Sequence, residues 1–469
     1  MRIEYKKLSI DILIFSFGVI GSKFILFLLL PLYTNVLLPS EYATADLIYT
    51  SVQLLMPIAS LAIYNGELRY GLEKDIDKSK VMSHANFVYI LALIILFPLV
   101  QLLRSYTLLT DWIYYIYFYV AAMLFCHIFN IGLKIYEKNK YYSISCMLQA
   151  LLLGSFNILF LVFYPLKIKG YVISLILSFF IVPLFMALVF KLRIFYFYKK
   201  LDNLLLKKMV VFSIPFVFND ISWWIIHATD KYMLGQLVGL HILGLYSTAS
   251  KIPSLINAIS GIFSQAWTIS AIKEYNNTSN NKYFSDILKK YYIFIYGILI
   301  ISVSFIKKFM SFYVSDAYFD SYRFAPTLLL AASFGAISAY TISVFSAYEK
   351  SKLIMKNTMI AAITNIVFNY ILISYFGVWG AIYATLISYI ILLYLNMKSL
   401  ETVRKININK NCFLSLTLLS IIQVICVTND IYDNYVSCIS ICTFVFIARF
   451  ELLNIKRIVC NYYKKYINF

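Results

Sequence analysis

Four polar residues are spaced along one apolar segment of this 469-residue chain so that their side chains could act together. In segment 209–235, Asp220, Trp224, His227 and Lys231 follow one another at i, i+4, i+7 and i+11. At about 3.6 residues per turn, this spacing places all four on one face of a helix. Ionisable groups inside an apolar span are costly and usually face a partner or a water-filled cavity, so each is a functional candidate.

Two other apolar segments add cations and polar groups. Lys23 lies near the middle of the first segment, and Lys251 and Gln265 share a helix face within 243–270. Lysines that face one interior would attract an anionic solute and repel cationic drugs. We therefore expect a cationic substrate cavity, lined by Lys23, Lys231, Lys251, Trp224 and Gln265.

Each of these residues also has a purely structural interpretation. Polar stripes are typical of helix-to-helix contacts, in which Ser and Gly permit close approach, and Asp220 could pair with a lysine only to neutralise it. Arg69 lies just beyond the second apolar segment. Its guanidinium could bind the phosphate of an entering substrate, or it could simply anchor the segment on the cytoplasmic side.

Motifs for other chemistry are weak. The chain has seven cysteines and four histidines, without a CxxC pair and without metal-ligand spacing. GxSxG, Walker and HExxH motifs do not occur in the sequence. We therefore expect no enzyme activity, no metal site and no cofactor.

The composition indicates that membrane-spanning helices hold the candidate residues. Hydrophobic residues make up 61% of the chain and charged residues 13%, whereas a soluble domain has about 25% charged residues. At about 20 apolar residues per crossing, this content suffices for about fourteen helices. The composition excludes a soluble enzyme, a secreted disulfide scaffold and a nucleic-acid-binding protein.

The predicted fold is an all-α integral membrane protein with about fourteen transmembrane helices. Most of the 41 Lys and Arg residues lie in alternate loops, as expected where basic loops remain in the cytoplasm, so both termini are predicted to be cytoplasmic. Apolar runs place the spans at 12–36, 44–64, 84–103, 112–133, 143–164, 170–190, 209–235, 243–270, 291–312, 325–347, 357–375, 380–397, 411–427 and 435–450.

Part of the sequence is repeated. Residues 136–140, Tyr-Glu-Lys-Asn-Lys, recur at 348–352 as Tyr-Glu-Lys-Ser-Lys, and the same offset of 212 relates Asn157 to Asn369. The repeat predicts two lobes of six helices related as in transporters with parallel repeats. The expected divisions are an N-lobe at 1–190, a basic cytoplasmic linker at 191–208, a C-lobe at 209–397, and two helices with a basic tail at 398–469.

Three stretches resemble polysaccharide repeat-unit flippases of the Wzx type, in the multidrug/oligosaccharidyl-lipid/polysaccharide exporter superfamily. The first is residues 27–42, Phe-Leu-Leu-Leu-Pro-Leu-Tyr-Thr-Asn-Val-Leu-Leu-Pro-Ser-Glu-Tyr. The second is 230–235, Asp-Lys-Tyr-Met-Leu-Gly, followed by Gly-Leu-Tyr-Ser at 244–247. The third consists of Asn365, Asn369, Gly377, Gly380, Ala381 and Ala384. The chain departs from the family at Ala43, where Gly is usual, and at Ser374, where Pro is common.

The resemblance implies a MATE-like inverted-V architecture with twelve core helices and two more at the C-terminus. It implies a flippase that moves an undecaprenyl-pyrophosphate-linked oligosaccharide, an O-antigen or capsule repeat unit, to the periplasmic leaflet by alternating access. Coupling to a proton or ion gradient would use Asp220, His227 and Asp230. The implied partners are this polyprenyl-pyrophosphate-linked oligosaccharide, membrane lipids, and the polymerase and chain-length regulator of the pathway, at the bacterial inner membrane.

Two other functions are alternatives. A drug or cation antiporter of the same superfamily would favour an acidic cavity. A membrane-embedded polysaccharide polymerase would place a large Arg- and His-bearing loop outside, whereas the longest expected outer loop runs only from about Leu37 to Ala43.

Overall fold

The protein is an all-helical membrane protein, as the composition predicts. Its structure is a computed structural model, in which no strand occurs among the described residues. Eleven described helices are long and apolar enough to cross a membrane, or up to twelve if one bent pair counts as a single span. The described residues are 21–22, 24–73, 75–103, 109–190, 201–274, 281–348 and 350–449.

The count of fourteen spans stays a prediction, because the first and the last predicted spans adjoin residues outside the described part. Within the first predicted span, the described apolar helix is only Phe24–Val36, and residues 12–20 lie outside the described part. The last predicted span corresponds to a helix at 433–449, which borders the undescribed residues 450–469. The second predicted span corresponds to the bent pair Pro39–Ala59 and Ile63–Gly71.

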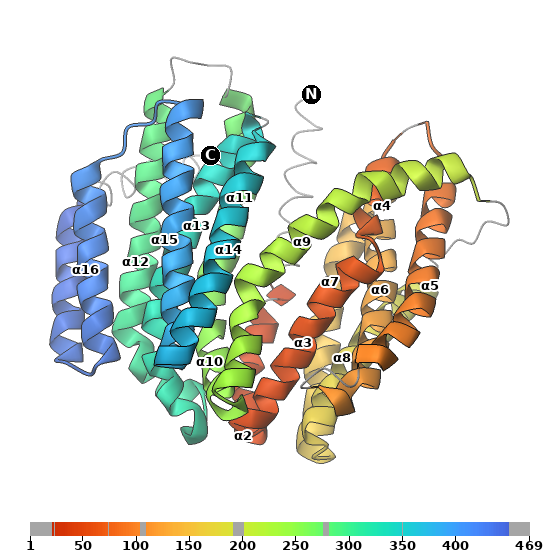
Figure 1. The fold of residues 1–469 in the computed structure, drawn as a ribbon, viewed down its shortest axis with the longest axis horizontal. Coiled ribbons are helices and arrows are strands. Elements are labelled where there is room, and N and C mark those ends of the chain that lie inside the picture. The colour runs from red at the N-terminus through yellow and green to blue at the C-terminus, as the bar shows by residue number, and fades with distance from the viewer. Residues whose placement is uncertain are drawn as a thin grey trace, which may run out of the picture. The chain divides into compact units, whose positions relative to one another are not determined.

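Residues 1–244 form one compact unit. In it, α9 packs on α3 and α4, α4 also packs on α5 and α6, and α6 packs on α8 (Figure 1). The segment expected as the start of the C-lobe thus packs within this unit as α9, and the predicted lobe boundaries stay a prediction. Its helices are α2 (Leu30–Val36), α3 (Pro39–Ala59), α4 (Ile63–Gly71), α5 (Lys78–Leu103), η2 (Thr110–Trp112), α6 (Ile113–Ile135), α7 (Asn139–Asn157), η3 (Ile158–Phe163), α8 (Lys167–Val189) and α9 (Asn203–Leu237).

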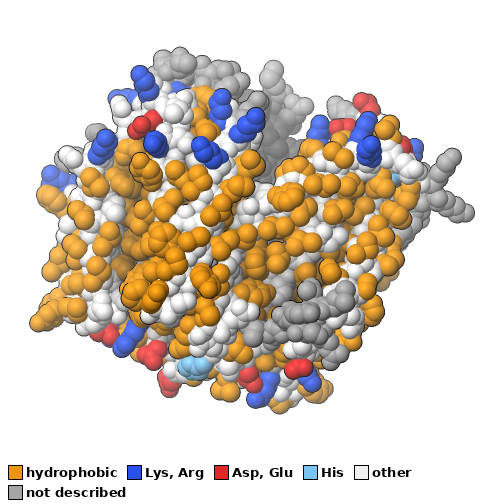
Figure 2. Space-filling view, in the orientation of Figure 1, with side chains coloured by type: hydrophobic (Ala, Val, Ile, Leu, Met, Phe, Trp, Pro, Cys, Tyr) orange, Lys and Arg blue, Asp and Glu red, His pale blue; other side chains and the backbone are white. Residues whose placement is uncertain are grey.

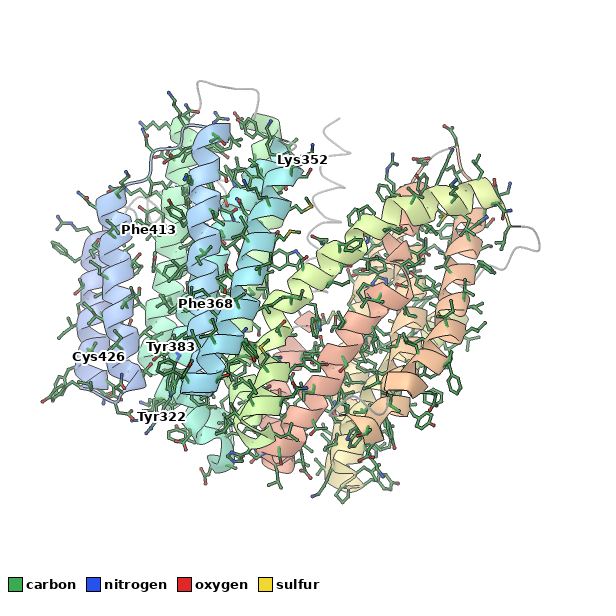
Figure 3. All side chains as sticks on the ribbon, viewed as in Figure 1. Tyr322, Lys352, Phe368, Tyr383, Phe413 and Cys426 are labelled. Atoms are coloured by element: carbon green, nitrogen blue, oxygen red, sulfur yellow. The ribbon has the colours of Figure 1, made fainter. Side chains whose placement is uncertain are left out.

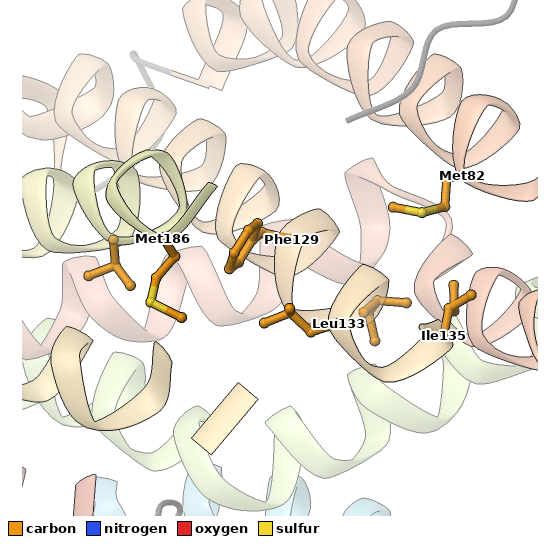
Figure 4. Packing of buried hydrophobic residues seen from close by; sticks show 7 residues of the cluster. Met82, Phe129, Leu133, Ile135 and Met186 are labelled. Carbon is orange, nitrogen blue, oxygen red and sulfur yellow. The ribbon is translucent and has the colours of Figure 1, made fainter. Parts of the chain in front are cut away.

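A hydrophobic cluster holds α5, α6 and α8 of this unit together (Figure 4). Met82 of α5, Phe129 and Leu133 of α6 and Met186 of α8 belong to this cluster, and all four are fully buried. Tyr64 and Leu68 of α4 pack against the same cluster. α4 therefore contacts both this cluster and α9.

Residues 245–469 form the second unit, built around α13. In the most apolar part of α13, 83% of the residues are buried, and the helix packs on α11, α12, α15 and α16. The buried Ser333 hydroxyl is satisfied within the helix, because it donates to the carbonyl of Leu329. Its elements are α11 (Pro253–Glu274), α12 (Asn281–Tyr313), η5 (Asp316–Arg323), α13 (Ala325–Ala347), α14 (Ser351–Phe376), α15 (Val378–Val403), α16 (Lys410–Thr428) and the helix at 433–449; α10 (Leu240–Lys251) contains the boundary between the units.

The surface follows the pattern expected of a membrane protein. Hydrophobic side chains cover the middle of the helices on the visible face, and most charged side chains gather near the helix ends (Figure 2). Within the second unit, Lys352 lies at one end, and Tyr322 and Cys426 lie at the opposite end (Figure 3). An apolar band of this kind matches the hydrocarbon core of a bilayer.

The two repeated segments adopt the same local backbone geometry. α7 begins at Asn139 and α14 begins at Ser351, 212 residues later. Before α7, the Lys138 N–H donates to the carbonyl of Leu133 at 2.8 Å, and before α14 the Lys350 N–H donates to that of Phe345 at 2.8 Å. Each partner lies 212 residues from its counterpart.

A close contact through glycine follows in each copy. A Cβ atom at Gly170 would lie 2.7 Å from the carbonyl oxygen of Phe160, and one at Gly380 would lie 2.1 Å from that of Leu372. Phe160 and Leu372 are again 212 positions apart. Both helix pairs, η3 with α8 and α14 with α15, thus approach too closely for any side chain at these glycines.

We expect Gly380→Ala to lower the free energy of unfolding by about 1–3 kcal/mol, because the new methyl group would push α15 away from a backbone carbonyl. Gly261→Ala in α11 is the matched control, since no atom lies within 4 Å of its Cβ position. That variant should be neutral or stabilising by about 0.5–1 kcal/mol. Thermal unfolding midpoints of detergent-solubilised protein test the difference, and equal midpoints for the two variants would contradict it.

Candidate functional site

The candidate site is organised by α9, the longest helix of the first unit. Its 35 residues span about 52 Å, well beyond the roughly 30 Å of a bilayer core. The helix begins where the Asp202 carboxylate accepts hydrogen bonds from the N–H groups of Leu204 and Leu205. Pro215 lies inside it. Polar side chains of its C-terminal half face α3 and α4.

A buried ion pair joins α9 to α3. Lys231 donates from Nζ to Oδ2 of Asp46 at 2.7 Å, and the two side chains are only 11% and 3% exposed. The backbone N–H of Lys231 also donates to the buried carboxylate of Asp230 at 2.8 Å. In an apolar interior, loss of either partner of such a pair is strongly destabilising, because it leaves the other charge buried and uncompensated.

Hydrogen bonds continue this contact along both helices. Trp224 donates from Nε1 to the carbonyl of Thr50 at 2.7 Å, and Tyr232 and Ser51 share a hydroxyl hydrogen bond. The rings of Trp224 and Tyr232 lie 5.5 Å apart. Since the Thr50 hydroxyl donates back to the carbonyl of Asp46, the α3 side of the contact is a connected network.

Towards its middle, α9 contacts α4. The Tyr64 hydroxyl donates to Oδ2 of Asp220. The backbone N–H of Gly66 donates to Oγ of Ser213 at 3.0 Å, and a Cβ at Gly66 would lie 2.7 Å from the carbonyl oxygen of Met209. The two helices are therefore in backbone contact, which only a glycine at this position permits.

The polar stripe predicted on α9 is thus a contact between helices in this structure. Asp220, Trp224 and Lys231 each bind a group of α3 or α4, and Asp230 is buried beside them. Lys231 therefore presents no free ammonium to a cavity here. The roles of these residues towards a substrate or a coupling ion stay predictions.

The other predicted site residues belong to other elements or lie outside the described part. Arg69 is exposed in the last turn of α4 and pairs with Glu73 at 2.8 Å. Lys251 ends α10, is half-buried, and belongs to the second unit. Lys23 and the side chains of His227 and Gln265 lie outside the described residues. Within the described part, no three His, Cys, Asp or Glu residues form a metal-binding group.

Sequence reasoning missed the partners of the stripe. Asp46 lies inside the predicted span 44–64. An ionisable residue inside an apolar span was the criterion that identified the candidates on α9, and it applies equally to Asp46. Thr50 and Tyr64 carried no signal, because their types are common in this sequence. Glu67 falls three residues beyond the predicted end of that span, yet the structure buries it completely.

The second unit carries a charged cluster at one helix end. Lys307 of α12 donates to Oδ1 of Asp430 at 2.6 Å, and Tyr322 of η5 donates to Oδ2 at 2.7 Å. The hydrogen bond from the Lys307 ammonium lowers the pKa of Asp430 below its usual value. Because this pKa is lowered on folding, the cluster stabilises the unit above the ordinary carboxyl pKa and loses that contribution as pH falls through the lowered value.

Comparisons with known proteins agree on the fold. Residues 10–268 match the model of a family described as polysaccharide biosynthesis protein. Lipid II flippase MurJ in an inward closed conformation is similar at a TM-score of 0.66 and 15% identity, covering 94% of this chain and 99% of that chain. A multidrug resistance MATE family transporter of the MOP superfamily, in an inward-facing conformation, is similar at 0.64 and 15% identity, covering 83% and 95%.

A MOP superfamily transporter from Pyrococcus furiosus, described as having a binding pocket of reversed polarity, is also similar, at a TM-score of 0.58 and 15% identity, covering 84% of this chain and 96% of that chain. No curated protein sequence matches the chain. At these identities the similarities to solved structures show the fold alone, and the predicted MATE-like fold is confirmed by them.

We expect Asp46→Asn to destabilise the protein by about 3–5 kcal/mol, because it leaves the Lys231 ammonium buried without its carboxylate. Glu73→Gln is the matched control, since it breaks an ion pair whose side chains are 57% and 34% exposed. Its cost should be about 0–1 kcal/mol. Unfolding midpoints in detergent measure both effects, and an Asp46→Asn midpoint as high as that of the control would show that the buried pair is not needed.

Proposed function

The chain belongs to the polysaccharide biosynthesis protein family, and from this premise we propose that it is a flippase for lipid-linked oligosaccharides. The cargo is an O-antigen or capsule repeat unit on undecaprenyl pyrophosphate, moved unchanged from the cytoplasmic to the periplasmic leaflet of the bacterial inner membrane. The match of residues 10–268 to the family model carries the proposal. The structural similarity to a lipid II flippase, which extends over 94% of this chain, supports it.

Cargo recognition is proposed to use the ion pair of the first unit. A desolvated lysine needs an anionic partner at every stage, so Lys231 pairs with Asp46 when the site is empty and with a pyrophosphate oxygen when cargo binds. Asp46 takes up a proton as it loses the ammonium, because its carboxylate would otherwise be buried without a partner. Because Asp46 lies on α3 and Lys231 on α9, this exchange would break the ion pair between the two helices, while the hydrogen bonds of Trp224 and Tyr232 to α3 would still have to be exchanged. Binding of the anion thereby removes one of the links that hold α9 on α3.

The remaining predicted site residues complete the proposal. Lys23, Lys251 and Arg69 provide further cationic contacts along the path of the pyrophosphate, and Trp224 and Gln265 contact the sugars. Asp220, His227 and Asp230 are the proposed coupling residues for a proton or ion gradient. The cytoplasmic placement of both termini and contact with the polymerase and chain-length regulator belong to the same proposal.

Loss of the protein in its source cell should accumulate lipid-linked oligosaccharide on the cytoplasmic leaflet, where a membrane-impermeant glycan probe added to inverted vesicles can label it.

Complementation with Lys231→Ala should leave flipping at least about tenfold below wild type, because the pyrophosphate loses its charge partner. Lys208→Ala, an exposed lysine of the same helix, should complement fully. The double variant Asp46→Asn with Lys231→Ala removes both charges of the pair and should regain stability without regaining flipping.

Other outcomes would contradict the proposal in distinct ways. Full flipping by Lys231→Ala, at wild-type expression, would remove the ion-pair mechanism. Dye resistance conferred by the protein without any change in lipid-linked oligosaccharide would indicate a drug antiporter. Altered polymer chain length with normal translocation of single units would indicate a polymerase.

A further inference from the structure

Glu67 of α4 is a buried carboxyl group that the proposed mechanism does not yet use. Its side chain is 0% exposed. The Tyr89 hydroxyl of α5 donates to Oε2 at 3.2 Å, and Oε1 has no hydrogen-bond partner among the described residues. Within the same residues, no Lys, Arg or His forms an ion pair with it.

This environment suits a neutral carboxyl group and not a carboxylate. An ionised carboxylate has about four acceptor positions and draws hydroxyl donors to about 2.5–2.7 Å. Glu67 instead has one donor at 3.2 Å and one orphan oxygen. A protonated carboxyl group makes fewer demands on its surroundings, so burial of this kind selects the protonated form.

Among the described side chains, the elements packed on α4 supply no cation to Glu67. They are α5, α6 and α9, and their titratable groups on this side are Tyr89, His127 and Asp220, together with Tyr64 on α4 itself. Two lysines on these elements are engaged elsewhere. Lys78 donates to the carbonyl of Ile135 at 2.9 Å, and Lys134 lies 4.5 Å from the ring centre of Tyr142. Lys231 of α9 pairs with Asp46, and the remaining described cations of these helices are exposed: Arg69, Lys80, Lys207 and Lys208.

Glu67 also lies in the short helix α4, which follows a bend between α3 and α4 that could act as a hinge. α3 and α4 meet at 58°, and the connecting residues Leu61 and Ala62 have φ values of 52° and 47°. These are left-handed conformations that residues other than glycine adopt at a cost. Ala62 closes the end of α3 by donating to the carbonyl of Pro57 at 2.9 Å. A short helix bearing a buried acid is therefore attached through a strained joint.

We propose that Glu67 is a proton-binding site whose loading and release move α4 about the joint at Leu61 and Ala62. With the proton bound, α4 packs as seen here against α5, α6 and α9. Release of the proton creates a charge that must reach water, which requires α4 to swing out. The proposal rests on the proposed flippase function, in which α4 holds α9 through Tyr64 and Asp220, so that proton exchange would act on the helix that carries Lys231.

Infrared titration of the purified protein in lipid nanodiscs tests the proton site without any cargo. Wild type should show the carbonyl band of a protonated carboxylic acid at neutral pH, and Glu67→Gln should lose that band. Glu73→Gln, six residues further on, just beyond the end of α4 and partly exposed, should keep it. A wild-type protein without the band, or a Glu67→Gln variant that retains it, would overturn the assignment.

Flipping in vesicles tests the coupling. Glu67→Gln imitates the protonated form permanently, so its flipping should lose the dependence on an imposed proton gradient that wild type and Glu73→Gln show. Unchanged gradient dependence in Glu67→Gln would overturn the coupling role even where the infrared band is lost. Absence of flipping in wild type would refute the flippase function while the infrared result still decides the proton site.

Discussion

The cost of a charge in an apolar interior shapes this structure more than any other constraint. The chain answers it in two ways. Lys231 and Asp46 neutralise each other at 2.7 Å between α9 and α3, whereas Glu67 has no cation among the described residues and is, in our proposal, a neutral acid. A buried ion pair holds two helices in contact, and a buried neutral acid keeps its helix packed only while its proton is bound. The position of each helix therefore depends on the charge state of its buried ionisable residues.

The position of α9 follows from such links. Lys231 meets Asp46, Trp224 meets the carbonyl of Thr50, and Asp220 meets the hydroxyl of Tyr64 on α4. These bonds specify the register of α9 in a way that apolar packing alone does not, because an apolar face tolerates sliding whereas a donor and an acceptor do not. Movement of α9 consequently requires these bonds to be exchanged together.

The sequence predicts the helices well and their partners poorly. Apolar runs located the spans that the structure describes because hydrophobic length is a local property, and the spacing of Asp220, Trp224 and Lys231 predicted their shared face for the same reason. Which helix that face meets depends on tertiary packing, so Asp46 was not identified. The joint at Leu61 and Ala62 was hidden too, since neither residue type signals a left-handed backbone.

The distinction between a structural and a functional polar stripe is less sharp in a membrane than the two initial interpretations suggest. A lysine exposed in an apolar path without an anion would be too costly to maintain, so a binding lysine needs a resident partner in the empty state. Asp46 fulfils that requirement for Lys231. A partner that holds the empty site closed must also be displaced by the ligand, so the anion has to compete with a carboxylate already in place. Stability of the empty state and selectivity for a strongly anionic cargo then have the same physical origin.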